Sequence, residues 1–323
     1  MIFYKNKNWS FIMQQFVEDK EIISFSSLFQ LFWRWRWVII FFTTFSAVSS
    51  ILFAINQADV YRASLIAMTP SDKNKGGFSG VTGQLGGLAG LAGISLGGSS
   101  EKSLRQIKEL LRSRSFLQTF IEHHHLVPNI IAAIGWNKKK NQVIYDPEVY
   151  DKKNNKWVRT PPPNKNVVPT SWEAYPLLFK AIYVEAITKK NLLKISVDHY
   201  SPYVAKQWTE WLLEDINTLY RERSKKEAND SITFLRKAFE QTSLTEIRSM
   251  LSSLLEDQMK AAMLSEVRQE FVLETLSSAV LPEDKDHPKR AFIVIIGTVL
   301  GGIVSLILVL ILNSIFPATS KHD

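Results

Sequence analysis

Two long stretches without a charged side chain, one toward each end of the sequence, constrain the fold most. Residues 37–55 contain 19 uncharged residues, WVIIFFTTFSAVSSILFAI, and residues 291–316 contain 26, AFIVIIGTVLGGIVSLILVLILNSIF. About 20 apolar helical residues cross the roughly 30 Å hydrocarbon layer of a membrane. We therefore predict transmembrane helices at residues 37–56 and 291–316. A cleaved signal peptide has a shorter apolar core nearer the start of the chain, so we favour a permanent anchor for the first stretch.

Aromatic and basic residues before the first stretch predict its orientation. The run WRWRW at residues 33–37 combines rings that gather at a membrane interface with positive charge that stays in the cytoplasm. Two spans return the chain to its starting side, so we expect residues 1–36 and 317–323 in the cytoplasm. Residues 57–290 then form one exported domain.

Composition limits the chemistry of this chain. It has 323 residues, with 39 Lys and Arg against 31 Asp and Glu, and a formal net charge of +8. It has no Cys, which excludes disulfide bonds, thiolate metal sites and Cys nucleophiles, and fits a bacterial inner-membrane protein. The exported segment carries 33 basic and 27 acidic residues, which we interpret as evenly spread, and we predict no nucleic-acid binding.

Patterns in the exported segment predict an α+β fold. Residues 60–68 are rich in strand formers, and apolar and polar residues alternate over 193–198, which is typical of a strand with one wet face. Residues 181–188 could be a strand or a buried helix. We expect an amphipathic helix over 103–124. The Pro-interrupted, Lys-rich residues 137–169 should be irregular and exposed.

A long helical arm is predicted next. Residues 203–281 contain neither Gly nor Pro, and they would follow a membrane-proximal mixed α/β base at about 57–202. The arm is one rod of roughly 120 Å, or a hairpin that turns near Thr242, with Ser243 and Glu246 in capping-box spacing. An extended arm buries little of its own surface, so we expect a homo-oligomer. Apolar residues recur every fourth position along it, at Ile247, Leu251, Leu255, Met259, Met263, Val267 and Phe271.

Three groups of residues are candidate structural sites. Gly297, Gly301 and Gly302 form a GxxxG element that allows close helix packing in the second span. A stiff turn into that span is expected from Pro282, Pro288, Lys289 and Arg290. Gly87, Gly90 and Gly93 belong to a Gly-rich segment without a phosphate-binding motif, which is either a flexible loop or a close subunit or lumen contact.

No group of residues predicts catalysis or cofactor binding. His123, His124 and His125 are consecutive, and neighbouring residues on a helix point about 100° apart, so we expect no metal site there. Carboxylates are mixed with Lys and Arg along the helices, as on a solvated face. We therefore predict a protein that is not an enzyme and has no cofactor.

The sequence resembles a known family at several motifs. They include SITFLR at 231–236, AVLPE at 279–283, PKR at 288–290 and the glycines of 297–302, with YRAS at 61–64 near the first span. In these motifs the chain resembles the Wzz-type chain-length determinants of lipopolysaccharide O-antigen, class 1 of the polysaccharide co-polymerases. Further similar segments are LAGLAGI at 88–94 and LRSRSF at 111–116, whereas 137–169 match less well.

The resemblance implies a fold and a role. It implies two inner-membrane helices, an α/β base, a helical periplasmic arm and a ring-shaped homo-oligomer. It also implies regulation of the O-antigen polymerase, with nascent lipid-linked polysaccharide and membrane lipids as further partners and no bond made by the protein itself. A regulator of enterobacterial common antigen, capsule or exopolysaccharide stays an alternative, as does, more remotely, a transmembrane sensor.

Overall fold

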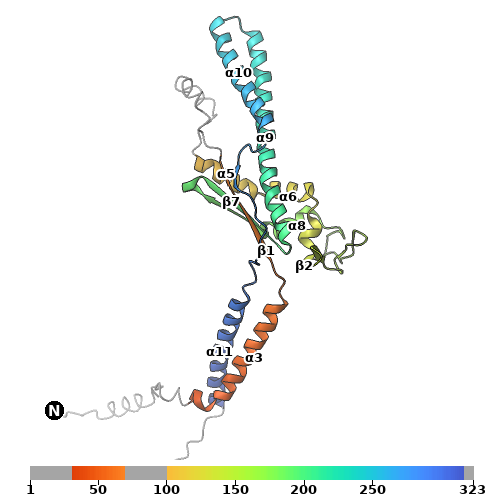
Figure 1. The fold of residues 1–323 in the computed structure, drawn as a ribbon, viewed down its shortest axis with the longest axis vertical. Helices are drawn as coiled ribbons and strands as arrows, with labels where there is room; N and C mark the ends of the chain where they lie inside the picture. The colour runs from red at the N-terminus through yellow and green to blue at the C-terminus, as the bar shows by residue number, and fades with distance from the viewer. Residues whose placement is uncertain (1–30, 70–99, 316–323) are drawn as a thin grey trace, which may run out of the picture. The chain divides into compact units, whose positions relative to one another are not determined.

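The computed structural model describes residues 31–69 and 100–315, and these form two units (Figure 1). One unit contains the described parts of Met1–Gln57 and Pro288–Asp323, and the other is Ala58–His287. We describe each unit by itself.

The first unit is a pair of apolar helices that pack along each other. Helix α3 (Arg36–Asn56) and helix α11 (Arg290–Ile315) lie where the two uncharged stretches predict them. Their most apolar windows have mean hydropathies of 2.3 and 2.9, and only 6% and 11% of those windows is buried. A core helix of a soluble protein is mostly buried, so these exposed apolar surfaces favour lipid as their environment.

A four-stranded sheet in the order β6–β7–β1–β8 organises the second unit. Strand β1 (Tyr61–Met68) pairs antiparallel with β7 (Leu192–His199), which pairs antiparallel with β6 (Ile182–Ile187). The predicted strands are confirmed, and the ambiguous 181–188 segment is a strand rather than a helix. The α+β class is confirmed as well.

Helices complete the core of this unit. Helix α5 (Ser100–Leu111), helix α8 (Ser171–Ala181) and the first part of α9 (Pro202–Gln241) pack against the sheet, and α6 (Arg114–His123) and α7 (Val127–Ile131) pack against α8. The single helix predicted over 103–124 is wrong. Ser113 interrupts it, because its hydroxyl accepts a hydrogen bond from the backbone N–H of Phe116 at 3.3 Å and caps α6. Core side chains include Leu65, Leu104, Leu117, Ile195, Trp208 and Leu212.

The Lys-rich insertion contains two small hairpins. Strand β2 (Ala133–Asn137) pairs with β3 (Gln142–Tyr145), and β4 (Tyr150–Asp151) pairs with β5 (Lys156–Trp157). The prediction of an irregular segment missed them, because each turn is made by Asn rather than Gly. Asn141 and Asn155 take the left-handed conformation, with φ of 47° and 49°, which Asn tolerates better than most residues.

The arm is a helical hairpin made of α9 (Pro202–Gln241) and α10 (Thr245–Val267). Figure 1 shows the two helices side by side. Of the two predicted geometries the hairpin is therefore observed, and it turns at residues 242–244. The predicted capping box is not formed, because Leu244 is the residue that precedes α10 and no side chain caps the helix.

The last part of the predicted arm is not helical. Helix α10 ends at Val267, and the chain returns to the sheet as strand β8 (Glu274–Ser277), which pairs with β1. Asn217 of α9 holds the returning segment. Its Oδ1 accepts from the backbone N–H groups of Val272 and Leu273 at 2.9 and 3.0 Å, and its Nδ2 donates to the Leu273 carbonyl at 2.9 Å. The absence of Gly and Pro from residues 203–281 therefore did not mean that the helix continues to Leu281.

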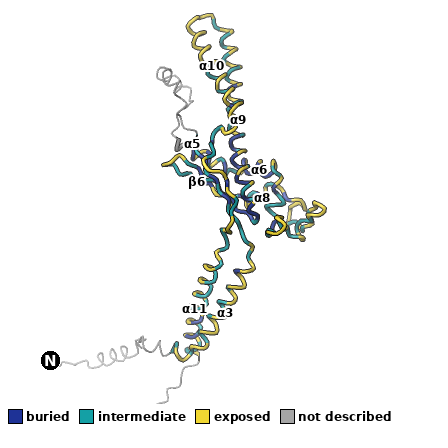
Figure 2. Tube along the Cα trace, in the orientation of Figure 1, coloured by how far each residue is buried: buried dark blue, intermediate teal, exposed yellow. Residues whose placement is uncertain are grey.

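The apolar stripe of α10 is buried at Leu251 and exposed toward its end. Leu251 is 8% exposed, whereas Met259, Met263 and Val267 are 51%, 61% and 79% exposed. A step of four residues in a helix with 3.6 residues per turn drifts by about 40°. The stripe therefore faces α9 near Leu251 and rotates away from it toward Val267, which leaves an apolar surface uncovered on a helix that is mostly exposed (Figure 2).

Candidate functional site

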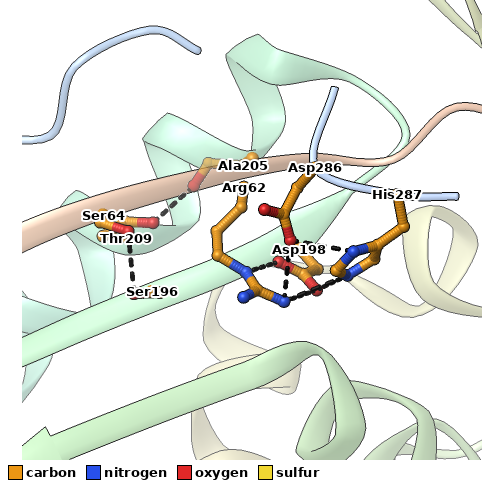
Figure 3. Close-up of polar contacts among 8 residues, drawn as sticks. All are labelled: Arg62, Ser64, Ser196, Asp198, Ala205, Thr209, Asp286 and His287. Carbon is orange, nitrogen blue, oxygen red and sulfur yellow. Dashed lines mark hydrogen bonds and ion pairs between the residues drawn. The ribbon is translucent and has the colours of Figure 1, made fainter. Parts of the chain in front are cut away.

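An ion-pair cluster joins the first and last segments of the second unit (Figure 3). Arg62 donates through Nε and Nη2 to the two carboxylate oxygens of Asp198, at 2.6 and 2.7 Å. Asp286 lies 3.2 Å from the same guanidinium, and His287 Nε2 lies 2.9 Å from Asp198 Oδ2. The cluster therefore ties β1 and β7 to the segment that precedes α11 in the sequence.

Strand pairing positions every member of this cluster. Arg62 and Asp198 are direct partners in the antiparallel β1–β7 ladder, so their side chains lie on the same face. Val60 and His287 form an isolated antiparallel bridge, with the Val60 N–H donating to the His287 carbonyl at 2.9 Å. This bridge brings Asp286 and His287 to the same place.

Burial and charge make the cluster a structural clamp. The Asp198 side chain is 9% exposed and that of Arg62 is 29% exposed. The hydrogen bonds to Asp198 raise the pKa of the Arg62 guanidinium above its usual value, against the opposing effect of burial. The guanidinium carbon also lies 4.3 Å from the centre of the Tyr183 ring.

The face of β7 that we predicted to be exposed to solvent is largely buried. Ser196 and Asp198 were expected to face water, yet they are 4% and 9% exposed. Ser64 covers Ser196 and donates to its hydroxyl at 2.9 Å, and Arg62, whose guanidinium lies over the Tyr183 ring, covers Asp198. The alternation of apolar and polar residues assigned the two faces of β7 correctly. It could not show that polar side chains from other strands bury the polar face.

A cavity of about 310 Å³ opens beside the cluster, lined in part by Tyr183, Asp198, Trp208 and His287. His199 also lines it and is 6% exposed. Its Nδ1 accepts from the Ser201 N–H at 3.0 Å, and its Nε2 lies 3.2 Å from the Asn129 carbonyl oxygen. Burial lowers the pKa of His199 to about 4, so the ring is neutral at pH 7 and its hydrogen bonds are satisfied.

The predicted turn residues lie between β8 and α11. The structure places Pro282 outside any helix, since the long helix had already ended at Val267, so Pro282 does not terminate it. Pro288 and Lys289 immediately precede α11, and Arg290 is its first residue. The Lys289 carbonyl accepts from the N–H groups of Phe292 and Ile293, and Arg290 Nη2 donates to the Gln57 carbonyl at 3.4 Å.

The predicted glycines of the second span face α3. A Cβ atom added at Gly297 would lie 1.6 Å from Ser50 Oγ, and one at Gly301 would lie 2.3 Å from Ser46 Cβ. At Gly302 the nearest atom would be 3.7 Å away, which is an ordinary contact. Ser46 Oγ donates to the Gly297 carbonyl at 2.9 Å. Gly87, Gly90 and Gly93 lie outside the described residues.

The consecutive histidines acquire a partner that the sequence did not indicate. His124 Nε2 lies 3.0 Å from Asp215 Oδ2, and its ring stacks on Trp211 with 4.1 Å between centres. One possible metal-ligand atom from each of His123, His124 and Asp215 lies within 4.8 Å of the other two. The His123 side chain is largely exposed to solvent. Asp198, Asp286 and His287 form a second such group, but Arg62 already neutralises its carboxylates.

Sequence reasoning did not single out the cluster residues as a site. Arg62 appeared only within a family motif, and Asp198 only as a polar position in an alternating strand. The sequence offered one indication of the cluster, namely that Arg62 and Asp198 lie on two strands predicted to belong to the same sheet. Their register, and the return of residues 286–287 to that sheet, were not predictable from spacing.

One family of known proteins matches part of this sequence. The model of the Wzz family, described as chain length determinant protein, matches residues 21–124. The matched segment, about a third of the chain, is similar to the family that the motifs resemble. No curated protein sequence matches the chain.

Two solved structures are similar to this chain. One is described as a full-length bacterial polysaccharide co-polymerase, with 13% identity, a TM-score of 0.36 and coverage of 93% of this chain and 100% of that one. The other is a fragment of WzzB, a polysaccharide co-polymerase from Salmonella Typhimurium, with 12% identity, a TM-score of 0.30 and coverage of 71% and 100%.

Proposed function

We propose that this protein regulates the chain length of lipopolysaccharide O-antigen. The observation that carries the proposal is the match of residues 21–124 to the Wzz family, in a chain whose sequence has an exposed apolar helix before and after residues 58–287. The protein acts as a scaffold that limits polymerisation by the O-antigen polymerase on lipid-linked repeat units. It forms and breaks no bond itself.

The proposed topology places α3 and α11 in the bacterial inner membrane, both termini in the cytoplasm and residues 58–287 in the periplasm. Positive charge at Arg34 and Arg36 beside α3 supports this orientation. Because the chain has no Cys, single Cys residues at Thr160 and at Ser320 give a clean test. A membrane-impermeant thiol reagent added to intact spheroplasts should label Thr160→Cys only, and labelling of Ser320→Cys alone would overturn the topology.

A homo-oligomer is part of the proposal. The uncovered apolar surface of α10, with Met259, Met263 and Val267, supports it, because such a surface gains free energy when a second copy covers it. We propose a ring in which the arms lie side by side.

Deletion of the gene tests the function. The expected result is loss of the clustered O-antigen lengths on a lipopolysaccharide gel, with lengths spread at random and restored by the gene on a plasmid. An unchanged ladder combined with altered enterobacterial common antigen, capsule or exopolysaccharide would support the alternative glycan, and no change in any of these would overturn the proposal.

A further inference from the structure

The positive charge of the second unit is concentrated in the two small hairpins. Residues 137–169 hold eight basic and three acidic residues, a net charge of +5, whereas the whole 57–290 segment has 33 basic and 27 acidic residues, a net charge of +6. The interpretation of an even spread is therefore wrong. We call the seven lysines of this insertion the lysine patch: Lys138, Lys139, Lys140, Lys152, Lys153, Lys156 and Lys165.

The lysine patch is open to solvent, and the three carboxylates of the insertion offset only part of its charge. All seven side chains are exposed, and the hairpins are drawn mainly as exposed chain beside α8 (Figure 2). Among the residues that the structure describes, none of these lysines forms an ion pair with a carboxylate, whereas Arg159 of the same insertion pairs with Glu173 at 3.0 Å. The patch therefore presents charge that an external anion can neutralise.

Apolar side chains are exposed on the same insertion. Ile144, Val158 and Val168 are 44%, 47% and 59% exposed. The hairpins are held by aromatic contacts, with ring centres of Tyr150 and Trp157 4.9 Å apart. Exposed lysines mixed with exposed Ile and Val suit the boundary between headgroups and acyl chains better than they suit a soluble polyanion, which offers no apolar phase.

The insertion is rooted close to the first apolar helix along the chain. The Trp136 ring, beside the turn of the β2–β3 hairpin, contacts the Tyr61 ring, with 5.4 Å between centres. Tyr61 follows Asn56, the last residue of α3, by five residues, and a chain of that length spans at most about 18 Å. The hairpins are thus tethered within reach of a membrane surface crossed by α3.

We propose that the lysine patch binds the anionic phospholipid headgroups of the membrane in which α3 and α11 are anchored. Each Lys near an anionic membrane surface adds its own increment of binding free energy. The affinity of the patch for the membrane therefore depends on how many lysines it has rather than on one contact. The inference rests on the membrane anchoring proposed above. It assigns the insertion the role of fixing the second unit against the lipid surface.

The test uses the full chain in nanodiscs of phosphatidylcholine, with or without phosphatidylglycerol. A fluorophore on Asn166→Cys reports approach to lipid headgroups that carry a quencher. We expect stronger quenching with phosphatidylglycerol, relieved by high salt. Replacing Lys138, Lys139 and Lys140 by Gln should lower the ratio of docked to undocked protein on the order of 100-fold. The matched control replaces three exposed lysines elsewhere, Lys189, Lys190 and Lys237, by Gln and should leave quenching unchanged.

Three outcomes would overturn the proposal. They are equal quenching in the two lipid mixtures, equal loss in the control variant, and quenching in phosphatidylglycerol that is unaffected by the triple substitution. Competition by soluble polyphosphate at an ionic strength where salt alone has no effect would show a general polyanion site instead. Failure of the chain to enter nanodiscs at all would refute the anchoring, which distinguishes that failure from failure of the lysine patch.

Discussion

Asp198 depends on Arg62 for its burial. A carboxylate that is 9% exposed loses most of its hydration, and the paired guanidinium compensates for that loss. We predict that Asp198→Ala destabilises the protein by about 2 kcal/mol, because it leaves the partly buried Arg62 with only Asp286. Thermal or urea unfolding in detergent, followed by Trp fluorescence, measures the change.

Lys285 supplies the control for that prediction. Its ion pair with Asp59 lies in the same region at 2.9 Å, but the two side chains are 34% and 37% exposed. Lys285→Ala should cost less than about 1 kcal/mol. The double variant Arg62→Met with Asp198→Ala should recover part of the stability lost in Asp198→Ala. Equal losses for Asp198→Ala and Lys285→Ala would contradict the clamp.

His199 makes folding stability sensitive to acid. Its pKa is about 4 in the folded protein and about 6.5 when unfolded, so the unfolded chain binds the proton more tightly. Its contribution is fully present above about pH 6.5 and is lost as the pH falls toward 4, by up to about 3 kcal/mol. We predict that His199→Asn, whose Oδ1 can accept from the Ser201 N–H, flattens the dependence of the unfolding midpoint on pH across this window.

The exposed His123 is the comparison for that measurement. His123→Gln also removes one imidazole, but from a side chain that is 68% exposed, and it controls for the loss of a histidine as such. A His199→Asn variant that keeps the parental slope would show that another group causes the acid sensitivity.

Contact between the two apolar helices depends on the absence of a side chain at two positions. Gly297 and Gly301 leave no room for a Cβ atom against Ser50 and Ser46, whose own Cβ atoms cannot move unless the helix moves. We predict that Gly301→Ala destabilises the helix pair by about 1–3 kcal/mol. The measurement is the thermal midpoint in detergent, together with the O-antigen length distribution in cells.

Gly302 offers a matched control one residue away. An added Cβ there would meet Thr43 at 3.7 Å, so Gly302→Ala should behave like the parent protein. If Gly302→Ala is as damaging as Gly301→Ala, the packing of α11 on α3 is not the cause.

The elements that sequence patterns predicted well are those defined by local periodicity. The apolar helices α3 and α11 and the strands β1 and β7 have strong local signals, namely charge-free runs and alternation. Strand β8 had none, because its position depends on pairing with β1 and on the hydrogen bonds that Asn217 makes far along the chain. The candidate cluster was missed for the same reason, since Arg62, Asp198 and His287 meet only through non-local register.

The uncovered apolar stripe of α10 predicts that copies of the protein assemble. Met263 is 61% exposed and lies three helical turns beyond the buried Leu251. We predict that Met263→Glu weakens the proposed oligomer, because it places a charge in an apolar contact between copies. Native mass spectrometry or light scattering of the detergent-extracted protein should show smaller particles, and the O-antigen lengths should spread.

Ser253 provides the control on the same helix. It is exposed but lies outside the apolar stripe, so Ser253→Glu should leave the particle size unchanged. Particles of parental size from Met263→Glu would place the contacts between copies elsewhere than on this part of α10.

The path of the arm has a consequence for how such proteins diversify. The chain enters the arm at Pro202, and Asn217 binds the returning chain at Leu273. The part of the arm between Asn217 and Leu273 in the sequence is therefore fixed at both of its ends. Inserting seven residues, two helical turns, in each of α9 and α10 would lengthen it by about 10 Å and keep the heptad phase. The length of the α9–α10 hairpin can therefore change in evolution while the register of the strands in the sheet stays the same.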